Sequence, residues 1–245
     1  MSERLDWPRP QWRRGMPLGA EAMLGRREAI AAVAACWAGA WMPRAAAQEP
    51  GTCVLTPDSG EGPFYFDPAL VRSDIREGSP GAMLELEIRV IRAGDCAVLR
   101  DARVDLWHAD GLGLYSGYAQ QPGVGARTES VEGKTFLRGT QITDADGRVR
   151  FRTIYPSWYR GRTPHVHFKV FLDNDEVVAS QVFFPEDVNR KVFATHVPYR
   201  DHVERRDTFN ETDSFLRGAP EGVFCTVEET GDGYRGSLTV AVRRA

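Results

Sequence analysis

Short runs that alternate apolar and polar residues, separated by turn residues, limit most strongly what this chain can fold into. Residues 84–90 read Leu-Glu-Leu-Glu-Ile-Arg-Val, and this period of two places every second side chain on one face of a strand. The same pattern recurs at residues 102–106, 148–153, 166–172 and 238–242. Sequences rich in Asp, Asn or Gly, which favour tight turns, lie at residues 144–147, 173–175 and 231–233. The chain is therefore predicted to contain many short strands.

These strands are not interleaved with helices, which predicts an all-β fold: an antiparallel β-sandwich whose long loops carry the functional site. One short helix is expected after residue 50, near residues 187–194. Residues 50–82 are rich in Pro, Gly and Asp and are expected to wrap the sandwich as extended chain. A hydrophobic content of 42% with 27% charged residues excludes a disordered chain and a polytopic membrane protein. Residues 48–245 are predicted to form one domain.

The first 47 residues have the three parts of a secretory signal. Arg26 and Arg27 precede an uncharged run at residues 29–43, and three alanines at residues 45–47 offer a cleavage site before Gln48. That run is shorter than the ~20 apolar residues that span a bilayer as a helix. Paired arginines before a weakly hydrophobic run resemble a twin-arginine signal, which exports folded proteins. We therefore predict a signal peptide and a periplasmic or secreted mature protein, without a transmembrane span once the leader is removed.

Two alternatives apply to this leader: a lipoprotein attached at Cys36, and an amphipathic helix that belongs to the fold. The charges divide at the same boundary. Residues 1–47 hold seven Arg and four acidic residues, whereas residues 48–245 hold 24 Lys and Arg against 30 Asp and Glu. An acidic body without a basic stripe argues against nucleic acid as a partner.

Three cysteines would remain after export into an oxidising compartment: Cys53, Cys96 and Cys225. At most one internal disulfide can then form, with three possible pairings, and one thiol is left over. The spacing of the three matches no zinc motif. One disulfide and one buried thiol are the expected outcome.

His165 and His167 are the clearest candidates for a metal site. Residues two apart on a strand point to the same face, so both imidazoles leave the sheet together while Val166 and Phe168 take the core face. Neutral imidazole is the commonest metal ligand. The alternative is a pair of polar residues on a solvent-facing strand, and the pair by itself does not decide between the two.

Phenols rather than carboxylates accompany this histidine pair. A facial triad for iron(II) would place a carboxylate at the second position, which is His167 here. Tyr155 and Tyr159 lie just upstream, and Tyr115 and Tyr118 follow the predicted strand near residue 106. A phenolate is a hard anionic oxygen ligand and suits iron(III) better than zinc or copper(I).

Two motifs make the chain recognisable. Residues 105–115 read Asp-Leu-Trp-His-Ala-Asp-Gly-Leu-Gly-Leu-Tyr, and residues 162–168 read Arg-Thr-Pro-His-Val-His-Phe after Thr-Ile-Tyr-Pro-Ser-Trp-Tyr at residues 153–159. In this order, with Gly-Pro-Phe-Tyr at residues 62–65 and Ser-Gln-Val-Phe-Phe at residues 180–184, they resemble the intradiol ring-cleavage dioxygenases. That family includes protocatechuate 3,4-dioxygenase and catechol 1,2-dioxygenase, and the leader would place this chain in an exported subgroup.

The resemblance implies a non-haem iron(III) enzyme with one Fe(3+) per chain. Its substrates would be a small aromatic diol and O2, and its product a muconate-type diacid that contains both atoms of O2. The implied metal ligands are Tyr115, Tyr159, His165 and His167. Tyr159 is also implied to accept a substrate proton, and Arg162 and Gln181 are implied to act beside the iron without ligating it. Arg162 would stabilise the charge that develops on the substrate ring.

The other polar and aromatic residues of the motifs are not expected to ligate. Tyr118 and Tyr155 would pack or line the pocket, and Trp107 and Trp158 would form its walls. His108 is a motif residue but not a ligand, and His196 and His202 are expected to be solvated.

A function of another class also fits these features: an exported, non-catalytic β-sandwich binding module with a structural or adventitious metal at His165 and His167. Extradiol cleavage by iron(II) is a third hypothesis, which the missing carboxylate ligand disfavours. Only five residues separate Tyr159 from His165, fewer than in the well-known enzymes of the family. The substrate preference is therefore not carried over from the family. The oligomeric state is not carried over either, because the sequence shows no helical dimerisation segment like that of the catechol 1,2-dioxygenases.

Overall fold

The computed structural model describes residues 53–119, 121 and 131–243 of the chain. The predicted leader at residues 1–47, with the arginine pair and Cys36, lies outside the described residues. Within the described part, none of the helices is long and apolar enough to cross a membrane.

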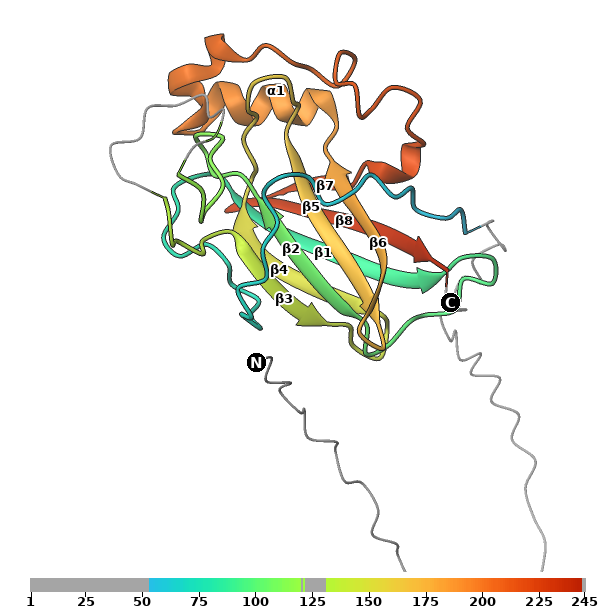
Figure 1. The fold of residues 1–245 in the computed structure, drawn as a ribbon. Coiled ribbons are helices and arrows are strands. Elements are labelled where there is room, and N and C mark those ends of the chain that lie inside the picture. Colours follow the sequence, from blue (N-terminus) through green and yellow to red (C-terminus); the bar gives the residue numbers. More distant parts are fainter. Residues whose placement is uncertain (1–52, 120, 122–130, 244–245) are drawn as a thin grey trace, which may run out of the picture. The chain divides into compact units, whose positions relative to one another are not determined.

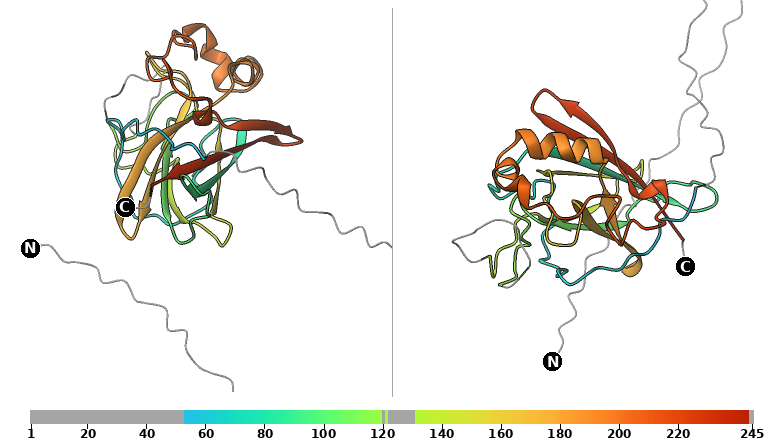
Figure 2. Two further views of the ribbon diagram at one scale, coloured as in Figure 1. Left: turned by 90° about the vertical axis from the view of Figure 1, so that its right-hand side faces the viewer. Right: turned by 90° about the horizontal axis from the view of Figure 1, so that it is seen from above.

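Two four-stranded sheets dominate the described residues (Figure 1). The strands are β1 (Met83–Arg92), β2 (Arg103–His108), β3 (Arg138–Ile142), β4 (Arg148–Ile154), β5 (His165–Leu172), β6 (Asp175–Phe183), β7 (Thr226–Thr230) and β8 (Gly233–Val242). One sheet has the order β4-β1-β8-β7 and the other the order β3-β2-β5-β6. The all-β sandwich predicted from the alternating runs is confirmed, and Figure 2 shows the two sheets facing each other.

One pairing differs from the antiparallel rule. β8 runs parallel to β1, with Leu84 beside Tyr234 and Val90 beside Val240, whereas the other strand pairs within the sheets are antiparallel. Alternation of apolar and polar residues determines which face of a strand is buried but says nothing about the direction of its partner. The alternating pattern therefore could not predict that β1 and β8 pair in parallel.

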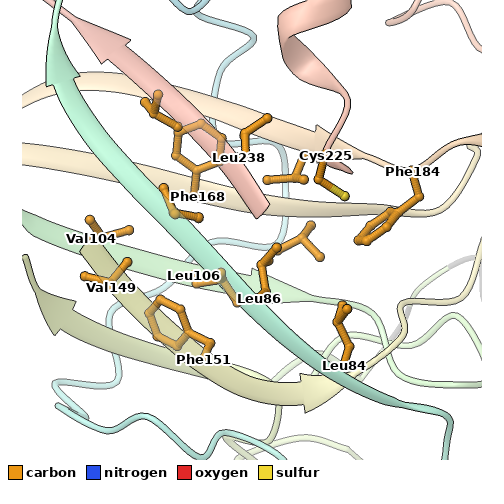
Figure 3. Packing of buried hydrophobic residues seen from close by; sticks show 14 of the residues in the cluster. Leu84, Leu86, Val104, Leu106, Val149, Phe151, Phe168, Phe184, Cys225 and Leu238 are labelled. Atoms are coloured by element: carbon orange, nitrogen blue, oxygen red, sulfur yellow. The ribbon is translucent and has the colours of Figure 1, made fainter. Parts of the chain in front are cut away.

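The core lies between the two sheets and is built from the alternating apolar positions. Leu84, Leu86, Val149 and Phe151 of one sheet meet Leu106 of the other in Figure 3. Val166 and Phe168 of β5 are fully buried in the same cluster, as the period of two predicted. Their burial leaves His165 and His167 on the opposite face of β5.

The predicted helix is confirmed as α1 (Glu186–Thr195). Glu186 and Asp187 lie in its first turn, where acidic side chains stabilise the positive end of the helix dipole. Two short 3-10 helices follow, η1 (Tyr199–Arg205) and η2 (Glu221–Val223). In Figure 1 the helix and the segments after it lie over the end of the sandwich where β5 begins.

The extended course predicted for the segment before β1 is also found. It contains no helix between residues 53 and 82, and it attaches to both sheets through backbone hydrogen bonds. The amide of Ser59 donates to Ala179, and that of Ile75 donates to Arg152. A disulfide joins Cys53 to Cys96, and the remaining cysteine of the described chain, Cys225, is buried. This segment covers the outer face of the β3-β2-β5-β6 sheet, where Tyr65 packs against Trp107 and donates to the Asp105 carboxylate, and both of these β2 side chains are buried.

Candidate metal centre

The centre lies on the face of β5 that points away from the core. His167 pairs with Trp107 of β2 on one side and with Gln181 of β6 on the other, and His165 pairs with Phe183. Paired residues of neighbouring strands project from the same face of a sheet. The strand register alone therefore brings the two histidines and Gln181 together.

Four predicted ligand atoms converge beside this face. The Nε2 atom of His165 lies 3.1 Å from Nε2 of His167, 3.2 Å from the Tyr115 hydroxyl oxygen and 3.4 Å from the Tyr159 hydroxyl oxygen. All four side chains are buried. Residues separated by up to 52 positions in the sequence thus present two nitrogens and two oxygens to one small volume.

A tight loop after β2 places Tyr115. The carboxylate of Asp110 accepts hydrogen bonds from the amides of Leu112 and Leu114 and so closes the loop. Gly113 has a φ of 76°, and a Cβ at this position would lie 2.3 Å from the carbonyl oxygen of Trp158. Only glycine permits this close approach, which brings the Tyr115 loop against the loop that carries Tyr159.

Arg138 also fixes this loop, a role that no local sequence pattern indicates. This side chain is buried and donates from Nε to the Ser116 hydroxyl (2.9 Å) and from Nη2 to the Ser116 carbonyl (2.8 Å). Its guanidinium also lies 4.2 Å from the ring centre of Phe66. Because Ser116 directly follows Tyr115, these contacts hold the phenol in place.

A second tight turn places Tyr159. The amide of Arg162 donates to the carbonyl of Tyr159 at 2.9 Å, and Gly161 between them has a φ of 80°. Arg162 therefore returns over the phenol, and its Nη1 atom lies 3.3 Å from the Tyr159 hydroxyl. Its Nη2 atom donates to Gln181, and its Nε atom donates to Asp213 at 3.0 Å. The structure thus brings Arg162 and Gln181 beside the four predicted ligands.

Burial favours the neutral forms of the four donors when no metal ion is bound. It raises the pKa of Tyr115 well above its ordinary value and raises that of Tyr159, which the Arg162 cation opposes. Burial, reinforced by the Arg162 cation, lowers the pKa of His165 and of His167 well below its ordinary value. Two neutral imidazoles thus face two phenols that need a positive charge in addition to Arg162 to ionise.

The donor set fits a ferric ion. Nδ1 of His165 lies 2.7 Å from the Thr163 carbonyl, so it carries the proton and leaves a lone pair on Nε2 that points into the centre. Among the described residues, no group of three or more His, Cys, Asp and Glu could hold a metal. The candidate centre instead combines two imidazoles with two phenols, and hard anionic oxygen ligands favour iron(III).

Aromatic side chains close the centre from the side of the covering segment. Trp107 stacks on His167 with ring centres 5.0 Å apart, and Phe64 stacks on Tyr115 at 4.5 Å. A Cβ on Gly62 would lie 3.2 Å from the His167 ring, so the covering chain runs directly over the imidazole. Trp107 forms a wall as predicted, and Phe64 is a wall residue that the sequence did not single out.

Two expectations about neighbouring residues are wrong. Trp158 does not line the centre but packs in the main core against Phe193, with ring centres 4.6 Å apart. His202 is buried rather than solvated and lies 4.9 Å from the Trp158 ring. Both differences have the same cause: α1 and η1 fold over this end of the sandwich. Phe193 of α1 and His202 of η1 pack against Trp158, although the sequence around His202 has the polar composition of a loop.

The remaining motif residues take non-ligand positions, as expected. Tyr155 is in the core and donates its hydroxyl hydrogen bond to Asn189 at 2.8 Å. Tyr118 lies edge-on to Phe64 and donates to the Tyr65 carbonyl. His108 is buried between Thr153 and the Ala109 carbonyl.

Comparisons with known proteins agree with this fold and identify the family. A family model described as Dioxygenase matches residues 61–199, more than half of the chain. An intradiol ring-cleavage dioxygenase of known structure from Tetranychus urticae is 30% identical, with a TM-score of 0.70 over 78% of this chain and 95% of that one. The fold and the family match define a β-sandwich protein of the dioxygenase class. The chain belongs to the intradiol ring-cleavage dioxygenase family.

Curated relatives match over a shorter stretch. The chlorocatechol 1,2-dioxygenase of Pseudomonas putida is 28% identical over 51% of this chain and 52% of its own length. The protocatechuate 3,4-dioxygenase beta chain of Burkholderia cepacia is 30% identical over 51% of this chain and 54% of its own length. The chain thus spans about half the length of the curated relatives it matches.

Proposed function

We propose that this protein is an iron(III) dioxygenase that cleaves a catechol-type ring between its two hydroxyl-bearing carbons. The ring would take up both atoms of O2, with no external reductant, and leave as a muconate-type diacid. The donor atoms of Tyr115, Tyr159 and His167 all lie within 3.4 Å of the Nε2 atom of His165, and this convergence carries the proposal. Names of relatives add support, since they include chlorocatechol, catechol and protocatechuate dioxygenases.

The four converging side chains would hold one Fe(3+) per chain. Bound there, the ion would act as a Lewis acid toward the two catechol oxygens and lower their pKa. The chain supplies two phenols that become anionic ligands and two imidazoles whose neutral form burial favours. The negative charges of the two phenolates would balance part of the positive charge of the ion in this buried centre.

Tyr159 is the residue best placed to handle a proton. Its hydroxyl oxygen lies 3.3 Å from Nη1 of Arg162, a donor that favours the phenolate form at this atom. A phenolate held in this way can accept a proton from the substrate hydroxyl and keep it on Oη. The Tyr115 hydroxyl has no such contact with Arg162 among the described hydrogen bonds, so the two phenols are not equivalent.

Arg162 would stabilise the negative charge that develops on the substrate ring. Its guanidinium is fixed on three sides and has no lone pair to offer a metal, so it can act only as a charge and a donor. A preorganised cation of this kind in a water-excluded site stabilises the transition state more than the ground state. Trp107 and Phe64 keep water from the centre on the other side.

We further propose that the protein works after export, as a periplasmic or secreted enzyme. Two features support this: the arginine pair at Arg26 and Arg27 with the alanines before Gln48, and the Cys53–Cys96 disulfide. Structural disulfides persist mainly in oxidising compartments. Attachment as a lipoprotein at Cys36 is the other outcome that N-terminal analysis of the exported protein would reveal.

Oxygen uptake with a panel of catechols tests the proposed reaction. The iron-loaded protein is expected to consume one O2 per catechol and, under labelled O2, to place both labelled atoms in an acyclic diacid. His167→Ala should lose uptake together with bound iron, whereas His196→Ala, a histidine outside the centre, should keep both. A protein that binds iron at the same residues but consumes no O2 with any catechol would instead be a binding module, and a yellow semialdehyde product would mean extradiol cleavage.

A further inference from the structure

The segment between η1 and η2 places a buried carboxylate behind Arg162. The side chain of Asp213 has no exposed surface, and its Oδ2 atom accepts hydrogen bonds from Nε of Arg162 (3.0 Å) and from the Thr163 amide (2.8 Å). Its Oδ1 atom accepts from the Phe215 amide at 2.8 Å. The carboxylate thus holds its own loop, the neighbouring main chain and the guanidinium at once.

Arg162 depends on this carboxylate for its orientation. The guanidinium has three anchored nitrogens, and the contacts at Nη1 with Tyr159 and at Nη2 with Gln181 both lie at the tip of the fork. Asp213 holds the base of the fork at Nε, and the Phe215 ring covers one face with its centre 4.0 Å from the guanidinium carbon. With Nε released, the planar fork would be free to turn about its last bonds and leave the Tyr159 hydroxyl.

A charged partner is needed because this arginine is 8% exposed. A buried cation without a counter-charge is costly, and a neutral acceptor would compensate it only in part. Asp213 also reaches the start of β5, since it binds the Thr163 amide while the Thr163 carbonyl lies 2.7 Å from His165 Nδ1. One carboxylate therefore sets both the guanidinium and the chain segment that leads into the predicted iron ligands.

We propose that Asp213 is a positioning residue that holds the Arg162 guanidinium over the Tyr159 hydroxyl. The effect on turnover rests on the proposed dioxygenase function. The positioning itself is a property of the protein chain and exists without metal. Asp213 touches neither of the histidines nor the phenols in the described hydrogen bonds, and it acts only through Arg162 and Thr163.

The first test measures the position of Arg162 in the metal-free, wild-type protein. NMR of arginine Nε–H groups, with Arg162 assigned through Arg162→Lys, reports how fast each proton exchanges with solvent. The Arg162 proton should exchange at least ten times more slowly than that of Arg190, whose Nε also faces a carboxylate but whose side chain is 63% exposed. Equal exchange rates would overturn the proposal, and this comparison needs no variant of Asp213.

The second test compares Asp213→Asn with Asp207→Asn in iron-loaded protein. Asp207 is a matched control because its exposed carboxylate accepts a hydrogen bond from the amide of Gly161, the residue before Arg162. Among the described hydrogen bonds, none joins Asp207 to the Arg162 guanidinium. Asp213→Asn should lower kcat by about 10- to 100-fold, the usual effect of losing an outer partner of a metal site, with KM for the catechol changed little. Asp207→Asn should keep kcat within about twofold, the range of independent surface changes.

A double-mutant cycle separates positioning from general damage. The amide oxygen of asparagine can still accept from the Thr163 amide, so Asp213→Asn removes mainly the charge that faces Arg162. Adding Asp213→Asn to Arg162→Leu should therefore change kcat by less than about twofold. A further loss of tenfold or more in that background, or wild-type kcat in Asp213→Asn, would contradict the proposal. An iron-loaded wild type without oxygen uptake would refute the proposed function, whereas slow Arg162 Nε–H exchange that becomes fast in Asp213→Asn would still support the positioning role.

Discussion

Arg162→Leu should separate two roles of one side chain, and the structure sets the size of each. The leucine removes the cation next to the reacting ring, and loss of one preorganised group of this kind costs about 100- to 1000-fold in rate, or about 2.7–4 kcal/mol. It also leaves the carboxylate of Asp213 buried and without its arginine. Breaking a buried ion pair on one side destabilises a protein by about 3–5 kcal/mol.

That loss of stability is measurable by thermal unfolding. For a chain of this size, a loss of about 3–5 kcal/mol lowers Tm by about 6–20 °C. Adding Asp213→Asn to Arg162→Leu removes the unpaired charge and should restore part of the lost Tm without restoring oxygen uptake. Arg162→Lys should keep more stability, because a cation stays beside Asp213, but recover only part of the turnover, because a point charge replaces a planar fork.

The assay is oxygen uptake at saturating catechol, run with iron content and Tm for the same samples. The expected result is bound iron retained in Arg162→Leu, uptake lowered at least 100-fold, and a Tm that rises again in the double variant. Wild-type uptake in Arg162→Leu would remove this residue from the reaction. An unchanged Tm would show that the buried pair with Asp213 contributes nothing to stability.

Three further predictions concern the ligands, the leader and a buried histidine. His165→Ala should lose most of the bound iron, whereas Tyr159→Phe should shift the visible absorption band and keep the fold; an unchanged spectrum and rate in Tyr159→Phe would refute its assignment. Exchange of Arg26 and Arg27 for lysine should stop export without affecting folding, and exported protein that still begins at Met1 would contradict the signal prediction. Burial lowers the pKa of His108 from about 6.5, its value in the unfolded chain, to about 4 in the folded protein. As the pH drops from 6.5 to 4, the unfolded chain therefore takes up this proton before the folded protein does. Over that range the free energy of unfolding should decrease by about 3 kcal/mol. The free energy of unfolding of His108→Gln, measured by denaturant titration between pH 6.5 and 4.5, should fall less steeply with decreasing pH than that of the wild type, the difference in slope being about 1 kcal/mol per pH unit. Parallel curves would contradict this.

The sequence predicted the sandwich and the grouping of the site residues for a simple reason. Alternation assigns each strand residue to a face, so Val166 and Phe168 had to be buried if His165 and His167 shared the other face. Through the family resemblance, the two motifs then assigned Tyr115 and Tyr159 to the same site as that histidine pair. Both the alternation within a strand and the order of the motifs can be read from one sequence alone.

What the sequence did not reveal depends on contacts between distant segments. Asp213 lies 51 residues after Arg162 in a stretch of ordinary polar composition, and no local pattern marks it as buried. The parallel β1–β8 pair and the burial of His202 also depend on how the last third of the chain folds back. Such contacts leave no periodicity, since each is made only once.

The visible spectrum of the purified, iron-loaded protein, taken with its metal content, tests the central claim most directly. Phenolate ligands on iron(III) should give a red-brown protein with one iron per chain, and addition of a catechol should change the absorption band. The Tyr115→Phe and Tyr159→Phe variants should each alter that band. A colourless protein that holds zinc or no metal after iron loading would contradict a ferric centre at Tyr115, Tyr159, His165 and His167.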